Sequence, residues 1–219
     1  MRNVTVGKTL FEVREGPWGP GIAPWGDGLG VTQMTKGRVR LTLRKNKAGA
    51  WLSAGIIGPV LADGQSAVLV VRNRLDMLDP RVVFAVWTKH TITTAEVDAL
   101  EATRWGDQNA PELYRLGYYP ENWKTGDPQA GPAKFAARAF KMHRITMTRH
   151  GSTVTVVVEG QRTDGSWKWV ANGTFPIGDN HVYKIALWCY ETGPTYDDAV
   201  NRGLMEVVLE SFEISDAVQ

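Results

Sequence analysis

Apolar and polar residues alternate along several short runs of the chain, and this two-residue period is the strongest constraint on its fold. In residues 38–44 (RVRLTLR), valine and leucine fall on one face of an extended chain, and arginine and threonine fall on the other. Residues 143–149 and 153–159 follow the same pattern. An apolar face opposite a polar face at this period is typical of half-buried antiparallel strands.

Short turn-forming sequences separate these runs. The pairs at 150–151 (His-Gly) and 164–165 (Asp-Gly) each stand between two predicted strands, and the pair at 172–173 (Asn-Gly) is predicted to end the next one. Gly, and to a lesser degree Asn and Asp, adopt positive φ at low cost, which suits tight hairpins. Residues 16–30 are rich in Gly and Pro and predict an ordered irregular loop.

Helical periodicity is nearly absent. Residues 130–140 are the best candidate, predicting a short turn or helix before the strand at 143–149. About a dozen short strands with turns between them predict an all-β fold, a two-sheet antiparallel β-sandwich of the jelly-roll kind. No linker or internal repeat is apparent, so we expect one domain over residues 1–219.

The composition is that of an ordinary globular protein, with 43% apolar and 22% charged residues. The formal net charge is +2, and no dense run of Lys or Arg predicts a nucleic-acid partner. No apolar window approaches the roughly 18 residues of a membrane span, so no membrane partner is expected. The chain shows no signal peptide, which leaves its location open: extracellular if this is a mature form, or carried on a virion.

Three acids lie within six residues of an otherwise apolar segment: Glu96, Asp98 and Glu101. Strict alternation would turn Glu101 toward the core, where an unpartnered carboxylate is costly. One extra residue, a β-bulge at Ala99-Leu100, would return Glu101 to the face of the other two acids. The segment therefore predicts a bulged strand with three carboxyl groups on one side.

Three neighbouring carboxylates repel one another, so at least one pKa should be raised. One carboxylate can then act as a nucleophile while another stays protonated as a general acid, as glycoside hydrolysis requires. The alternative is that these acids form a solvated outer face, since this spacing also arises by chance.

The segment EVDALE resembles the E-x-D-x-x-E signature of glycoside hydrolase family 16, in the bulged form of laminarinase-like members. FAVW at 84–87 and the segments 140–161, 185–190 and 204–214 resemble other strands of that family. The resemblance implies a concanavalin-like jelly roll with a concave glycan-binding sheet. It also implies retaining chemistry on β-linked polysaccharides.

Carried over to this sequence, the resemblance makes Glu96 the nucleophile and Glu101 the acid/base, with Asp98 holding the proton between them. The chain departs from the family pattern at Ala95, where Gly is usual, and at Ala102, where a larger residue is common.

Nine tryptophans are many for 219 residues, and aromatic rings are suitable platforms for the apolar faces of sugars. The predicted substrate-binding residues are Trp105, Trp123, Tyr118 and Trp87, although Trp87 lies in an apolar strand where a core role is the alternative. Trp51 and Trp188 are expected in the core for the same reason.

No cofactor is expected, because the four histidines are scattered and no zinc-ligand spacing is present. A structural calcium ion is left open, since acids and loop carbonyls are plentiful. The single cysteine, Cys189, is predicted to be a buried structural thiol.

Two functions from different classes remain at this stage. The first is a retaining endo-glycoside hydrolase or transglycosylase acting on a β-linked polysaccharide, with a polysaccharide or oligosaccharide as partner. The second is a non-catalytic glycan-binding or structural module on the same fold, for example a component of a phage particle, because fold does not fix function. Self-association is open in both.

Overall fold

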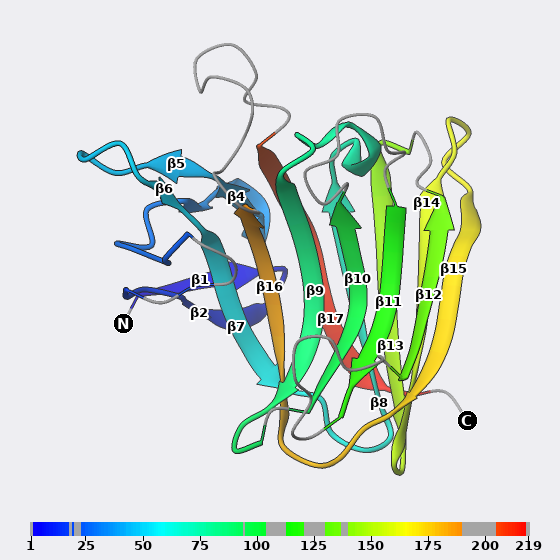
Figure 1. Cartoon of the computed structure of the whole chain (residues 1–219). Helices are drawn as coiled ribbons and strands as arrows, with labels where there is room; N and C mark the ends of the chain where they lie inside the picture. Colours follow the sequence, from blue (N-terminus) through cyan, green and yellow to red (C-terminus); the bar gives the residue numbers. More distant parts are fainter. Residues whose placement is uncertain are drawn as a thin grey trace.

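Two large antiparallel sheets face each other in the computed structural model and form a β-sandwich, as the alternating pattern predicted (Figure 1). The structure describes residues 2–17, 19, 23–93, 95–103, 113–120, 130–136, 140–189 and 205–217. No helix in these ranges is long and apolar enough to cross a membrane.

The eight-stranded sheet carries the acidic segment. Its strands, in spatial order, are β1 (Asn3–Val6), β2 (Thr9–Val13), β7 (Ala54–Val60), β16 (His181–Cys189), β9 (Val82–His90), β10 (Glu96–Thr103), β11 (Leu113–Tyr119) and β12 (Ala130–Ala136). Strand β10 thus lies between β9 and β11, inside the sheet and away from both edges.

The seven-stranded sheet covers the other side of the core. Its strands, in spatial order, are β15 (Trp167–Pro176), β14 (Thr153–Gln161), β13 (Met142–His150), β8 (Gln65–Arg72), β17 (Glu206–Asp216), β4 (Val39–Thr42) and β3 (Val31–Gln33). The described residues also form a two-stranded ribbon and two 3₁₀ turns: β5 (Arg44–Lys45), β6 (Trp51–Leu52), η1 (Thr35–Gly37) and η2 (Leu75–Met77).

The core lies between the two sheets and is built from the apolar faces of the strands. In β13 and β14 every second residue is buried, which confirms the alternation in residues 143–149 and 153–159. Aromatic rings join the sheets: Phe212 of β17 packs edge-on against Phe11 of β2 and Tyr183 of β16, at centroid distances of 4.9 and 5.0 Å.

Two local predictions were wrong. Residues 130–136 form strand β12, because their backbone pairs with β11 and sheet pairing overrides a weak helical pattern interrupted by Gly131 and Pro132. Strand β15 does not end at Asn172 but continues to Pro176, with Gly173 paired to Val156. The predicted turns at 150–151 and 164–165 are confirmed, with positive φ at both glycines.

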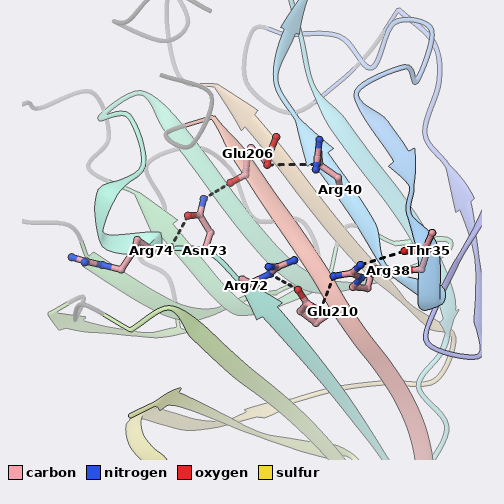
Figure 2. Close-up of polar contacts among 8 residues, drawn as sticks. All are labelled: Thr35, Arg38, Arg40, Arg72, Asn73, Arg74, Glu206 and Glu210. Carbon is pink, nitrogen blue, oxygen red and sulfur yellow. Dashed lines mark hydrogen bonds and ion pairs between the residues drawn. The ribbon is translucent and has the colours of Figure 1, made fainter. Parts of the chain in front are cut away.

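A group of charged and polar side chains connects β4, β8 and β17 of the seven-stranded sheet (Figure 2). Arg72 pairs with Glu210, and Arg40 Nε lies 3.5 Å from Glu206 Oε1. Figure 2 also shows Asn73 reaching the backbone carbonyl of Glu206. The positive charges of Arg40 and Arg72 are therefore each balanced by a glutamate of β17.

Candidate active site

A β-bulge in β10 places the three acids on one face, as the sequence predicted. Asp98 lies opposite Trp87 of β9, while Leu100 lies opposite the next residue, Val86, so Ala99 is the extra residue. The register against β11 shifts at the same place. Apolar members of β10 are fully buried in the core: Val97, Ala99, Leu100 and Ala102. The acids consequently point to the opposite face of the eight-stranded sheet.

The sheet is hollowed beside these acids because its neighbouring positions carry very small residues. A row of paired residues crosses the sheet from β7 to β11: Gly55, Ala186, Ala85, Glu101 and Arg115. A cavity of about 280 Å³ has Ala85 and Glu101 of this row in its lining. Its lining comprises Gly19, Trp25, Ala85, Trp87, Lys89, Glu96, Asp98, Glu101, Lys184 and Trp188.

One wall of the cavity is Trp25, from the Gly/Pro-rich segment after β2. Its ring packs directly on β7, where a Cβ atom at Gly55 would lie 2.4 Å from the ring. Gly16 and Gly26 exchange backbone hydrogen bonds of 2.9 Å and close the segment. The Arg14 guanidinium lies 5.7 Å from the centroid of the Trp25 ring. Glycine at position 55 therefore lets an aromatic wall approach the sheet.

Glu101 is a nearly buried carboxyl group, 8% exposed. Burial raises its pKa to about 7, the negative charge of Glu96 adds to this, and Arg115 opposes it. The nearest cation, Arg115 Nη1, is 3.9 Å from Glu101 Oε2, and among the described residues this oxygen accepts no hydrogen bond. Glu101 can therefore hold a proton near neutral pH and deliver it into the cavity.

Asp98 is more deeply buried than Glu101, at 3% exposed. Burial, followed by the negative charges of Glu101 and Glu96, holds its pKa well above the usual range. Tyr119 of β11 is hydrogen-bonded to the Asp98 side chain. Burial and these same acids raise the pKa of the Tyr119 hydroxyl, which therefore stays protonated and donates to Asp98.

Glu96 is the most accessible of the three acids, with about a quarter of its side chain exposed. It stands at the start of β10, opposite Lys89 of β9 and Tyr119 of β11. Lys89 Nζ lies 3.3 Å from Glu96 Oε2. The arrangement offers an open carboxylate beside two buried carboxyl groups, which suits division of labour between a nucleophile and an acid.

The predicted aromatic residues have different positions. Trp87 lines the cavity next to Asp98. Tyr118 lies opposite Val97 and packs, partly buried, against the core, so its neighbour Tyr119 is the tyrosine beside the acids. Trp105 and Trp123 lie outside the described residues, and their binding role stays a prediction.

Sequence reasoning missed several cavity residues. Trp188 was expected in the core but lines the cavity, together with Lys184 and Trp25. The signal was present in β16, because Lys184, Ala186 and Trp188 follow each other at a spacing of two and must share a face. The lysine in that series marks the face that points away from the core. Trp51, in contrast, packs against the core as expected.

In the ranges that the structure describes, no group of three or more His, Cys, Asp or Glu side chains is arranged to hold a metal ion. Cys189 is fully buried, and burial raises the pKa of its thiol to about 11, in line with the structural role predicted for it. His143 is also buried, where its Nε2 lies 2.7 Å from the hydroxyl of Tyr114.

Solved structures share this architecture over nearly the whole chain. A β-glucanase of Bacillus licheniformis is 13% identical, covers 99% of this chain and 98% of its own, and gives a TM-score of 0.62. The chain has the fold of the β-glucanases. A prokaryotic β-1,3-1,4-glucanase (lichenase) from a mouse hindgut metagenome is 14% identical, covers 95% of this chain and 93% of its own, and gives a TM-score of 0.59.

A third similar structure is a Mycobacterium tuberculosis protein described as an immunostimulatory antigen and pseudo β-1,3-glucanase. It is 13% identical, with 95% coverage of this chain, 91% of its own and a TM-score of 0.62. No protein-family model and no curated protein matches the sequence. At these identities the likeness concerns the fold, and the chemistry must be argued from the cavity.

Proposed function

We propose that the protein is a retaining endo-glycoside hydrolase or transglycosylase acting on a β-linked polysaccharide, related to glycoside hydrolase family 16. The observation that carries the proposal is the bulged strand β10, whose three acids line a cavity walled by Trp87, Trp188 and Trp25. Carboxyl groups supply the acid and the nucleophile of glycoside cleavage, and indole rings stack on sugar faces.

Glu96 is the proposed nucleophile, because it is the exposed member of the three and opens directly to the cavity. It would attack the anomeric carbon and form a glycosyl-enzyme bond while the leaving sugar departs. Glu101 is the proposed acid/base, since a pKa of about 7 allows it to protonate the leaving oxygen and then to activate the incoming water or sugar hydroxyl.

Asp98 lies between these two residues along the strand and is proposed to control where the proton resides. Burial, with the charges of Glu101 and Glu96, raises its pKa and keeps a second protonatable group beside the reacting pair, while the hydrogen bond from Tyr119 favours the charged form. Tyr119 would act as a positioning residue, through Asp98. Trp87, directly opposite Asp98, is proposed as the platform for the sugar ring.

The test is release of reducing ends from a panel of β-glucans, β-galactans and cell-wall glycans, by the wild type and by Glu96→Gln. We expect release by the wild type and a loss of at least about a thousandfold in the variant, because the covalent step has no nucleophile. Far-UV circular dichroism should be unchanged. A variant with undiminished turnover contradicts the role of Glu96.

The non-catalytic glycan-binding module is the second candidate, and the fold it shares with a pseudo β-1,3-glucanase supports it. The same panel separates the two. Binding of a glycan by affinity electrophoresis, without release of reducing ends by the wild type, favours the module; release favours the enzyme.

A further inference from the structure

Lys184 projects from the middle of the eight-stranded sheet into the same cavity as the acids. Register places it directly opposite Trp87 of β9, which in turn lies opposite Asp98 of β10. Two strand spacings, roughly 10 Å, therefore separate the backbone positions of Lys184 and Asp98. Lys184 therefore lines the same cavity as the acids from a position two strands away.

No carboxylate in the described part of the chain pairs with Lys184. Lys89, its neighbour in the cavity, differs because its ammonium lies 3.3 Å from Glu96. Arg115 likewise lies beside Glu101, and Arg144 beside Glu159. Lys184 is thus a half-buried cation that the described side chains leave without an ion pair.

Holding this cation there is unfavourable for the folded protein by itself. Burial, followed by the positive charges of Lys89 and Arg14, brings its pKa down to about 8, and the negative charge of Glu96 opposes this shift only in part. The ammonium is still mostly charged at neutral pH, yet it is poorly solvated. An anion entering the cavity would supply the missing partner.

The surroundings indicate what kind of anion fits. Trp87 lies directly opposite the lysine, and Trp188 lines the same cavity four residues further along β16. Aromatic faces of this kind receive sugar rings. A free small anion would not use these indole rings, and a neutral sugar could accept a hydrogen bond from the ammonium but would not balance its charge. A sugar that carries a negatively charged substituent uses both.

We propose that the cavity selects a β-linked glycan with an anionic substituent, a carboxylate or a sulfate ester, and that Lys184 determines this specificity. The charged group lies on the sugar ring next to the one held over the acids. This inference rests on the proposed function, because it takes the cavity to be a glycan site.

The experiment measures binding to three matched polymers: a neutral mixed-linkage β-glucan, the same glucan oxidised to carboxylate at C6, and the same glucan sulfated. Binding is followed by affinity electrophoresis in a Glu101→Gln background. This background is expected to prevent turnover, and it leaves the Lys89–Glu96 pair intact. The variants are Lys184→Met, Lys184→Arg and, as a control for loss of one charge, Lys8→Met in the exposed β1–β2 turn.

We expect at least one anionic polymer to bind about tenfold more tightly than the neutral one, equivalent to about 1.4 kcal/mol. Lys184→Met should remove most of this preference without weakening neutral binding, while Lys184→Arg and Lys8→Met should keep it. The carboxylated and sulfated polymers tell which substituent is preferred.

A pH series tests the charge of Lys184 directly. A lysine with only a structural role would not change the preference for the anionic polymer with pH. The preference should fade between about pH 7 and 9 with Lys184, since its pKa is about 8, and persist with Lys184→Arg. Equal binding of all three polymers, or a preference that survives Lys184→Met, overturns the proposal but leaves the proposed function standing. Binding of none of the three also overturns the proposal, and the release assay on the wider glycan panel then decides the proposed function.

Discussion

Glu101 illustrates how a single buried side chain can combine chemical use with a cost to stability. Its folded pKa of about 7 lies above the ordinary 4.5, so the folded state binds this proton more tightly than the unfolded chain. Between these pH values the unfolded chain has released the proton and the folded protein has not. The contribution of Glu101 to the free energy of unfolding therefore falls as pH rises from about 4.5 to 7.

Glu101→Gln should accordingly stabilise the protein at pH 8, by about 1 to 3 kcal/mol in the free energy of unfolding, and have little effect at pH 4. Urea unfolding at the two pH values measures the difference. Glu213→Gln, at an exposed position of β17, is the matched control for replacing one glutamate by glutamine. A Glu101→Gln protein that is less stable at pH 8 would show that the Arg115 pair outweighs burial.

At the scale of an element, the bulge in β10 means that deleting one residue from this strand has different consequences at different positions. Without Ala99, Asp98 would still face Trp87, Leu100 would face Val86 and Glu101 would face Ala85, because Ala99 has no partner of its own on β9. Removal of Val97 would instead make Glu96 and Asp98 adjacent, so that one of them must turn toward the core.

We expect deletion of Ala99 to cost no more than about 2 kcal/mol and deletion of Val97 to cost more than about 3 kcal/mol, since the latter buries a carboxylate and loses an apolar side chain. Far-UV circular dichroism with urea unfolding provides both numbers. Equal destabilisation by the two deletions would contradict this expectation. It would mean that losing the bulge costs as much stability as turning an acid of β10 toward the core.

The same element shows how far sequence reasoning reaches. The bulge could be predicted because an unbulged strand would bury Glu101, a conflict visible within β10 alone. The choice between Tyr118 and Tyr119 could not, because it depends on the register of β11 against β10, and pairing partners are not encoded locally. Strand β12 was missed for the same reason: only its pairing with β11 makes it a strand.

For the whole molecule, the alternation was enough to predict two sheets with one core, but not which strands are neighbours. Cavity residues come from segments far apart in the chain, such as Trp25, Glu96 and Lys184. The sequence gives the chemical type of each side chain. Whether Glu96 and Lys184 line one cavity depends on the strand order β16-β9-β10. Lys184 therefore became a candidate only once the fold was known.

We propose that the two sheets unfold together as one domain, because the aromatic contacts of Phe212 bind them through a shared core. Leu69 and Leu187 are fully buried, one in each sheet. Leu69→Ala and Leu187→Ala should each lower stability by about 2 to 5 kcal/mol. Tryptophan fluorescence and circular dichroism should report coincident transitions in both variants; separate transitions would indicate two independent units.

The strand order also has a consequence for how the molecule is made. Two strands late in the described part of the chain, β16 and β17, do not lie at the edges: β16 is inserted between β7 and β9, and β17 between β8 and β4. Neither sheet can close on the ribosome until these residues have emerged, so the nascent chain carries open strand edges until then. Folding must then wait for pairings distant in sequence, which makes it slow and exposes the growing chain to aggregation and to chaperones.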